Sequence, residues 1–181
     1  MNNAVLFIQG GGNGGYQADA KLVRSLQAAL GKTYEVHYPE MHTDETLPDF
    51  GWLRQIREEI DKIKGGVILV GHSLGASLLL KYLSEHKIKK KIDGIFLIST
   101  PFWRGEEDWK QGLKVHESFP GRLPKDIPIF LYQSHDDEEV SFQDVSLYSE
   151  KLPHATVREV AKGGHQLNND LTIVAKDIES L

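Results

Sequence analysis

Cysteine is absent from this chain of 181 residues, and its absence excludes disulfide bonds, thiolate ligands for a metal and a cysteine nucleophile. The sequence also has no apolar run close to the ~20 residues that cross a bilayer. Its first apolar run, residues 4–8, has no basic segment before it and is shorter than the ~7–15 residues of a signal peptide's hydrophobic region. We therefore expect a cytoplasmic protein that is stabilised by packing.

Positive charge is scarce, because 21 Lys and Arg residues stand against 26 Asp and Glu residues, a formal net charge of −5. A negative field repels phosphate backbones and anionic lipids, so we expect neither a nucleic-acid partner nor a membrane partner. The other proportions, 40% hydrophobic and 26% charged residues, are typical of a globular protein. Since domains usually have about 100–150 residues, the length predicts a single domain over residues 1–181.

Short runs rich in branched residues alternate with longer stretches of helical spacing. The runs predict strands at residues 4–9, 34–38, 67–70, 92–98, 127–133 and 156–160, and the longer stretches predict helices at residues 17–30, 50–63, 74–85 and 171–181. Such alternation is typical of the α/β class, in which helices cover both faces of a mostly parallel sheet. The expected architecture is a three-layer α/β/α sandwich.

Residues 100–128 interrupt this alternation with a long segment of weak periodicity. Connections beyond ~12–15 residues are usually functional loops or disordered, and the aromatic residues Phe102, Trp103 and Trp109 argue against disorder. The segment is therefore either a lid or substrate loop, or a small cluster that packs over the sheet. In the first case, these three aromatic side chains are expected to bind the substrate.

The sequence Gly71-His72-Ser73-Leu74-Gly75 stands between a predicted strand and a predicted helix. A G-x-S-x-G pattern in this context is typical of a sharp turn that lifts a nucleophilic serine clear of the sheet, and the two glycines let the helix approach the strand closely. Ser73 is the predicted nucleophile. The backbone N–H of Leu74, near the start of the helix, is expected to donate to an oxyanion.

A nucleophilic serine needs a base and an orienting carboxylate, which in such strand–turn–helix sites follow in the order serine, acid, histidine. His165 lies in a glycine-rich loop between the last predicted strand and the last predicted helix, where a base is expected. Asp136 and Asp137 both follow the strand predicted at residues 127–133. Successive side chains on extended backbone point in opposite directions, so we expect only one of the two to reach His165.

The glycine-rich sequence after the first predicted strand allows two interpretations. In a hydrolase, Gly11 would supply a second N–H for the oxyanion. The same loop also fits the pattern G-x-G-x-x-G through Gly10, Gly12 and Gly15, and Glu40 could bind the ribose of a dinucleotide. We favour the hydrolase, because the dinucleotide interpretation leaves the serine, the acid and the histidine without a role.

The motifs QGGGNGG, GHSLG, SHDDEEV and GGHQ occur in this order along the chain. In this combination the sequence resembles the α/β-hydrolase superfamily. It is most similar to the small single-domain serine hydrolases grouped with retinoblastoma-binding protein nine and its bacterial relatives. The resemblance extends from Ala4 to the last helix and implies a minimal α/β-hydrolase fold with a short lid loop.

This resemblance also implies roles for particular residues. Ser73 matches the family's nucleophile and His165 its base, and Asp137 matches the acid because Asp137-Glu138-Glu139-Val140 fits the family's Asp-x-x-Val. Two positions depart from the family's pattern: Gln9 stands where many relatives have histidine, and Ser141 stands where proline is common. Neither position belongs to the triad.

The expected activity is hydrolysis of a carboxylic ester or a related small acyl substrate through an acyl-enzyme. His165 would take the proton of Ser73, Asp137 would hold the imidazole tautomer, and the N–H groups of Gly11 and Leu74 would stabilise the tetrahedral oxyanion. This chemistry requires no metal and no organic cofactor. The alternative is a non-catalytic interaction protein on the same fold, because a fold alone does not determine function.

Overall fold

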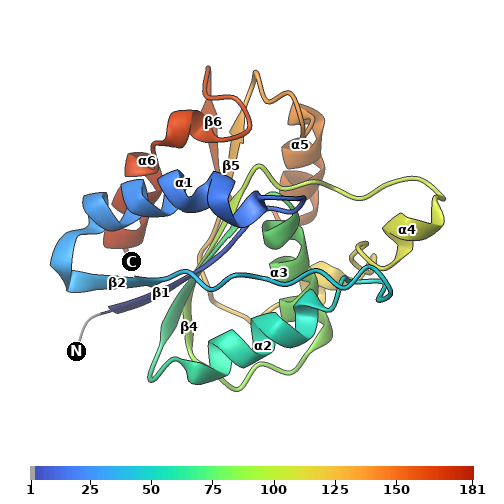
Figure 1. Ribbon diagram of the computed structural model, residues 1–181, viewed down its shortest axis with the longest axis horizontal. Helices are drawn as coiled ribbons and strands as arrows, with labels where there is room; N and C mark the ends of the chain where they lie inside the picture. Colours follow the sequence, from blue (N-terminus) through green and yellow to red (C-terminus); the bar gives the residue numbers. More distant parts are fainter. Residues whose placement is uncertain (1–2) are drawn as a thin grey trace.

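One six-stranded sheet forms the centre of the protein, and each pair of neighbouring strands is parallel. The computed structural model describes residues 3–181. The sheet order is β2-β1-β3-β4-β5-β6 (Figure 1). The strands are β1 (Asn3–Ile8), β2 (Tyr34–His37), β3 (Val67–His72), β4 (Ile92–Ile98), β5 (Ile129–Ser134) and β6 (Thr156–Val160). The predicted strands are confirmed, with small shifts at some ends.

Helices cover both faces of the sheet, as the predicted sandwich requires. In Figure 1, α1 and α6 lie together on one face, and α2, α3 and α5 lie on the other. The α-helices are α1 (Gly15–Leu30), α2 (Trp52–Lys62), α3 (Leu74–Glu85), α4 (Asp108–Gln111), α5 (Phe142–Lys151) and α6 (Thr172–Glu179), and short 3₁₀ turns lie at η1 (Gly31–Thr33), η2 (Phe119–Arg122) and η3 (Leu167–Asn169). Within residues 3–181, no helix combines the length and the apolar character needed to cross a membrane.

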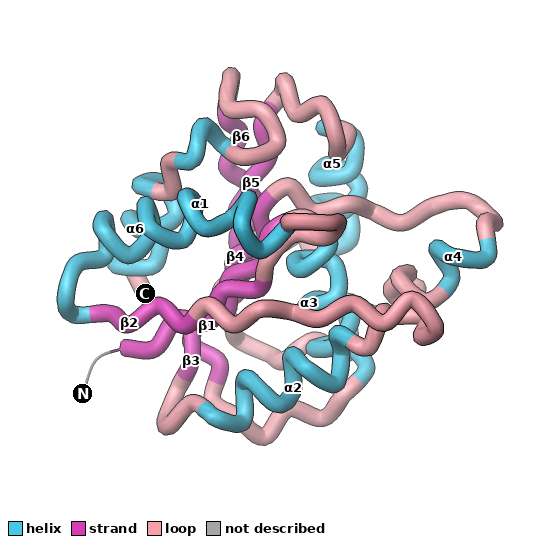
Figure 2. The backbone as a smooth tube through the Cα atoms, in the orientation of Figure 1, coloured by secondary structure: helices cyan, strands magenta, loops and turns pink. Residues whose placement is uncertain are grey.

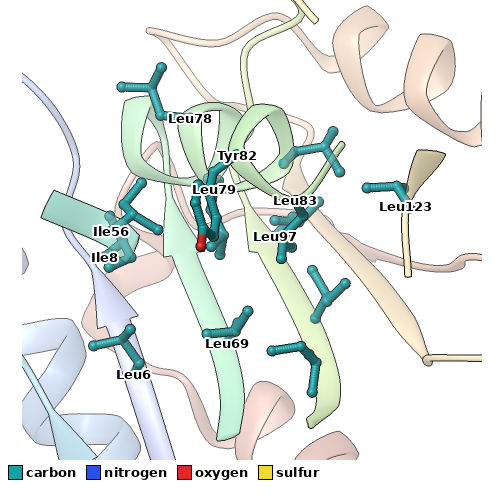
Figure 3. Close-up of a cluster of buried hydrophobic side chains, with 14 of the residues drawn as sticks. Leu6, Ile8, Ile56, Leu69, Leu78, Leu79, Tyr82, Leu83, Leu97 and Leu123 are labelled. Atoms are coloured by element: carbon teal, nitrogen blue, oxygen red, sulfur yellow. The ribbon is translucent and has the colours of Figure 1, made fainter. Parts of the chain in front are cut away.

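The central strands are buried on both faces, which explains their near-continuous apolar sequence. All residues of β3 are buried. Figure 3 shows the cluster between the sheet and α3, in which Leu69 and Leu97 of the strands lie below Leu79 and Leu83 of the helix. Burial of apolar surface contributes roughly 25 cal/mol to the free energy of unfolding for each Å² removed from water. The buried sheet is therefore a stable base for the loops that follow its strands.

The helix predicted at residues 50–63 begins two residues later than expected. Phe50 and Gly51 both have positive φ values, 56° and 71°, which are incompatible with a right-handed helix. The carboxylate of Asp49 accepts hydrogen bonds from the N–H groups of Gly51 at 3.1 Å and Leu53 at 3.3 Å. The helix therefore starts at Trp52, and Phe50 belongs to the preceding loop.

Helix α5 was not predicted from the periodicity of the sequence. Its signal is the residue that precedes it: the side chain of Ser141 accepts a hydrogen bond from the N–H of Gln143 at 3.2 Å, as helix-capping serines do. Asp144 follows three residues after Ser141, the spacing of a helix start. This capping pattern, rather than hydrophobic spacing, marks the helix.

Residues 100–128 contain α4, η2 and long loops, and Figure 2 shows the loop before α4 extending away from the sheet. The segment is nevertheless attached to the body of the protein, because Leu113 and Phe119 are fully buried. It also contacts the loop before α2. A Cβ atom at Gly112 would lie 1.9 Å from the carbonyl oxygen of Pro48.

Helix α3 begins in direct contact with the end of β1. A Cβ atom at Gly75 would lie 2.1 Å from the carbonyl oxygen of Gln9 and 2.7 Å from that of Ile8. Only glycine allows this approach. It brings the glycine-rich loop that follows β1 against Ser73.

Replacing Gly75 by alanine should lower the free energy of unfolding by about 2–3 kcal/mol, because the added methyl group forces β1 and α3 apart. Urea denaturation measures this change. Gly121→Ala is the matched control, because a Cβ atom there has no neighbour within 4 Å, and it should change the free energy by less than about 0.5 kcal/mol. Equal stability of the two variants would contradict the close contact of β1 with α3.

Candidate active site

Ser73 forms the tight turn between β3 and α3. Its backbone has φ 52° and ψ −123°, a conformation that costs a non-glycine residue of the order of 1–3 kcal/mol. The surrounding structure holds the turn: the N–H of Ser73 donates to the carbonyl of Ile98 at 2.8 Å. A Cβ atom at Gly71 would lie 2.6 Å from the Cα atom of Ala76. The half-buried side chain of Ser73 consequently lies at the wall of a cavity.

His165 and Asp137 form a buried hydrogen-bonded pair. Both carboxylate oxygens of Asp137 lie 3.0 Å from Nδ1 of His165. Their side chains are only 5% and 0% exposed, His165 first. The residues follow the ends of β6 and β5, which are neighbours in the sheet, so the loops that carry them meet at one edge. The structure thus brings the expected base together with Asp137.

Hydrogen bonds keep Asp137 ionised. Burial alone would raise the pKa of this carboxyl, but hydrogen bonds from His165 and from the backbone N–H groups of Val140 and Glu139 outweigh burial and lower the pKa to about 2. Gln133, which is fully buried, also donates to Asp137 from Nε2 at 2.8 Å. The carboxylate therefore faces Nδ1 as an acceptor, which fixes the proton of a neutral imidazole on that nitrogen.

The charge of Asp137 in turn acts on His165. Burial alone would lower the pKa of His165, but the hydrogen bond and the charge of Asp137, with smaller contributions from the charges of Glu139 and Asp19, raise it above the ordinary histidine value. The imidazolium form is thereby stabilised. That form arises when a histidine accepts a proton from a nucleophile.

Asp136 is the other aspartate that the sequence offers as a partner of His165, and its carboxylate binds other groups. Its Oδ1 atom accepts hydrogen bonds from Ser134 Oγ at 2.6 Å and from the N–H groups of Gly163 at 2.8 Å and Gly164 at 2.9 Å. These bonds hold the pKa of Asp136 well below its usual range. Asp136 therefore anchors the loop that carries His165, and does so through the backbone rather than through the imidazole.

The second ring nitrogen of His165 faces Glu139. Nε2 lies 3.5 Å from Oε2 of Glu139, whose side chain is 66% exposed. Among residues 3–181, no hydrogen bond joins this imidazole to the hydroxyl of Ser73. Contacts between a base and its nucleophile are often loose before substrate binds. Since Glu139 is exposed, its side chain can rotate into solvent and away from Nε2 of His165.

The two N–H groups expected to bind an oxyanion belong to Gly11 and Leu74, which are far apart in the sequence but in contact in the structure. Gly11 packs directly on Leu74, because a Cβ atom at Gly11 would lie 2.6 Å from Cδ2 of that leucine. In the described part of the chain, neither N–H donates to another protein group. Both residues line the same cavity as Ser73. Unpaired N–H groups at a helix start and in a glycine loop are suited to an anionic oxygen.

The cavity beside Ser73 has a volume of about 550 Å³, which is within the range of small-molecule sites, roughly 300–1,000 Å³. Phe102, Trp103 and Trp109, which the sequence analysis expects to bind the substrate, all line it. Its wall also includes Phe50 and Leu113, which sequence reasoning missed. Phe50 was assigned to a helix, and its positive φ could not be read from the pattern.

The aromatic side chains of this wall are fixed to different degrees. Trp103 donates from Nε1 to Ser77 Oγ at 3.0 Å, which ties its ring to the first turn of α3. Trp109 packs edge-on against Trp103 with ring centroids 5.6 Å apart, and it is 56% exposed. The wall thus has a fixed inner part at Trp103 and an exposed outer part at Trp109.

Three of the charged side chains that line the cavity, Arg104, Asp144 and Lys110, are already paired. Arg104 contacts Asp144 at 2.6 Å, and Lys110 contacts Glu107 at 2.7 Å. Between residues 3 and 181, no cluster of three or more histidine, aspartate or glutamate side chains is arranged to hold a metal ion.

Gln9, one of the two departures from the family pattern, supports the loop before α2. Its Oε1 atom accepts a hydrogen bond from the N–H of Met41 at 2.8 Å, and the side chain is buried. The glutamine therefore connects the end of β1 to the loop that carries Phe50.

Comparison with known proteins relates this arrangement to hydrolases. A family model described as serine hydrolase matches residues 17–171. No curated protein sequence gives a significant match.

Solved structures share the fold at low sequence identity. Arabidopsis thaliana SOBER1 is 16% identical, with 99% of each chain covered and a TM-score of 0.69. The ydeN gene product of B. subtilis is 19% identical, with 99% of this chain and 98% of that chain covered and a TM-score of 0.71. Est1E of Butyrivibrio proteoclasticus, solved with ferulic acid bound, is 13% identical, with 98% and 87% covered and a TM-score of 0.74.

We expect the pKa of His165 to lie above the ordinary value of ~6.5, and to fall in the variant Asp137→Asn because the amide no longer stabilises the imidazolium. NMR titration of the imidazole measures it. The matched control is Asp136→Asn, which should leave the pKa of His165 unchanged because that carboxylate bonds only Ser134 and backbone N–H groups. A lower pKa in the control and an unchanged one in Asp137→Asn would reverse the assignment of the two aspartates.

Proposed function

The chain belongs to the serine hydrolase family, and we propose that it hydrolyses carboxylic esters of small acyl groups through a covalent acyl-enzyme. In this proposal Ser73 is the nucleophile, His165 the general base and Asp137 the group that orients His165. The N–H groups of Gly11 and Leu74 bind the oxyanion.

The main support for the proposal is that two independent features occur at the same edge of the sheet. One is the strained turn that holds Ser73 at the cavity wall. The other is the buried contact of His165 with Asp137 at 3.0 Å. Backbone strain at a serine and a buried imidazole–carboxylate pair both cost free energy, and both are useful to acyl transfer.

In the acylation step, Glu139 first turns away and Nε2 of His165 accepts the proton of the Ser73 hydroxyl. The serine oxygen forms a bond to the carbonyl carbon, and the carbonyl oxygen takes up the negative charge beside the N–H groups of Gly11 and Leu74. The bond to the leaving alcohol then breaks. The alcohol departs with the proton from His165, and the acyl group remains on Ser73.

In the deacylation step, water attacks the acyl carbon while His165 accepts one of its protons. A second tetrahedral oxyanion forms in the same position. It collapses with cleavage of the bond to Ser73, whose oxygen recovers the proton from His165. The carboxylic acid is released and the enzyme is restored.

The cavity supports a small acyl group as substrate. Its aromatic wall offers large apolar surfaces with few rotatable bonds, and the anchored segment of residues 100–128 contributes the buried Leu113 to its lining. Est1E, a protein of the same fold, was solved with ferulic acid, a small carboxylic acid with one ring. Short or compact acyl groups fit such a site better than long lipid chains do.

Treatment with a serine-directed phosphonate should place one adduct on the peptide that contains Ser73, and Ser73→Ala should lose about 10⁴–10⁶-fold in ester turnover. Peptide mass spectrometry and a p-nitrophenyl acetate assay measure the two results. Ser149→Ala, a serine at a distance from the cavity on α5, is the control and should keep both labelling and turnover.

An adduct on another peptide, or full turnover by Ser73→Ala, would refute the proposed nucleophile. Labelling of Ser73 without turnover of any ester in a series of acyl lengths would favour the alternative, a binding protein that keeps the hydrolase fold.

Removal of the outer wall should relax acyl selectivity. We expect the parent enzyme to prefer p-nitrophenyl acetate and butyrate over the decanoate. Trp109→Ala should shift the ratio of kcat/KM values toward the decanoate by about tenfold, the size of effect that a change of one or two methylene contacts produces. Leu181→Ala is the control, because that residue is also an exposed apolar side chain but lies outside the cavity. An unchanged ratio in Trp109→Ala would mean that the tryptophan does not limit acyl length.

A further inference from the structure

A second histidine–aspartate pair lies behind the nucleophile turn, and the proposed mechanism does not use it. His72, the residue before Ser73, contacts Asp19 of α1 with 2.8 Å between Nδ1 and Oδ2. Both side chains are only 1% exposed. A buried ionisable pair costs desolvation free energy, so its presence next to the site calls for a physical reason.

The hydrogen bonds of His72 determine where its protons are. Nε2 of its ring lies 3.0 Å from the backbone carbonyl oxygen of His165. A carbonyl oxygen only accepts, so Nε2 must carry a proton. Nδ1 faces a carboxylate oxygen of Asp19, which accepts as well unless Asp19 is protonated.

The other contacts of Asp19 favour its ionised form. Oδ2 also accepts a hydrogen bond from the N–H of Gly10 at 2.7 Å, and Oδ1 accepts one from Nε2 of Gln166 at 3.1 Å. Burial alone would raise the pKa of Asp19, but these bonds together with the bond and charge of His72 hold it below its ordinary value. Asp19 is thus in hydrogen-bond contact with Gly10, His72 and Gln166.

These bonds connect the segments that make the site. Gly10 precedes Gly11 in the oxyanion loop, His72 precedes Ser73 in the turn, and Gln166 follows His165. The carbonyl of His165 is held by a further donor, Ser99 Oγ, at 3.1 Å. Each segment is therefore fixed at the residue next to its functional group.

On the basis of the proposed function, we propose that His72 and Asp19 are positioning residues: a buried, hydrogen-bonded histidine–aspartate pair that fixes the oxyanion loop, the nucleophile turn and the loop of His165 relative to one another. The pair binds no substrate and takes no proton from it. It acts on the reaction by holding the N–H of Gly11 and the ring of His165 in place.

An amide cannot replace the carboxylate of Asp19. One oxygen, Oδ2, accepts from both Gly10 and His72. In Asp19→Asn, a nitrogen at this position cannot accept the bond from Gly10. An oxygen at this position can accept from both groups, but it no longer carries the negative charge that strengthens the contact with His72. In both arrangements at least one of the three segments is held less firmly.

NMR of the unmodified enzyme, labelled with nitrogen-15 in its histidines, tests the hydrogen bond from His72 to the loop of His165. We expect Nε2 of His72 to carry a proton, because this nitrogen faces the backbone carbonyl oxygen of His165 at 3.0 Å. The variant His72→Gln identifies the signals by their loss. A His72 ring whose Nε2 carries no proton would overturn the proposal, and this result does not depend on any variant that must fold.

Kinetics of Asp19→Asn test the positioning role. Displacement of the oxyanion loop by a fraction of an ångström should lower kcat for p-nitrophenyl acetate about 10- to 100-fold, while KM stays close to that of the parent because the lost contacts act on the transition state. The rate of phosphonate labelling at Ser73 should fall in parallel.

The matched control is Asp177→Asn. Asp177 is also a buried carboxylate, which accepts hydrogen bonds from Tyr132 at 2.7 Å and from Arg158 at 2.7 Å, and it does not line the cavity. It should lose stability in urea as Asp19→Asn does, yet keep the parent's kcat. An equal loss of kcat in both variants would mean that Asp19 acts only through stability, and would overturn the proposal.

The outcomes separate this inference from the proposed function. If Ser73→Ala keeps full turnover, the proposed function fails. If Ser73 is the nucleophile but Asp19→Asn keeps the parent's kcat, the proposed function stands and the positioning role of the pair is refuted.

Discussion

The chain has to pass from β3 into α3 within a single residue, and the rest of the site is arranged around this turn. Ser73 occupies a left-handed conformation that the neighbouring backbone enforces. Gly71 and Gly75 allow α3 to approach both β3 and the end of β1 at distances that exclude a side chain. The same approach places Gly11 against Leu74. Strain at one residue and contact at two glycines thus create the proposed nucleophile position and the proposed oxyanion position together.

Most of the fold could be predicted from local patterns. The apolar runs and helical spacings are strong because the sheet is buried on both faces, and they gave the strands and the α/β class. Chain order also predicted that His165 and Asp137 lie together, since loops after the carboxyl ends of parallel strands meet at one edge. The choice of Asp137 over Asp136 came from a family pattern, and the hydrogen bonds now give its physical basis: Asp136 is engaged by the N–H groups of Gly163 and Gly164.

What the sequence could not predict depends on contacts between distant segments. In the sequence, Asp19 is one polar residue within a predicted helix. It is buried beside His72 only because α1 packs on the sheet. Phe50 reaches the cavity because two consecutive residues adopt positive φ. Glu139 lies in an acidic run that has the appearance of a solvated loop, yet it faces Nε2 of His165. No hydrophobic periodicity and no motif in the sequence indicates any of these features.

In the proposed mechanism, Ser73, His165, Gly11 and Leu74 act on one reacting carbon, and a crystal structure of the phosphonate-treated protein would show whether they do. We expect phosphorus bonded to Ser73 Oγ, one phosphoryl oxygen within hydrogen-bond distance of the N–H groups of Gly11 and Leu74, and Glu139 turned away from Nε2 of His165. Phosphorus on another residue, or a phosphoryl oxygen directed to solvent away from both N–H groups, would contradict it.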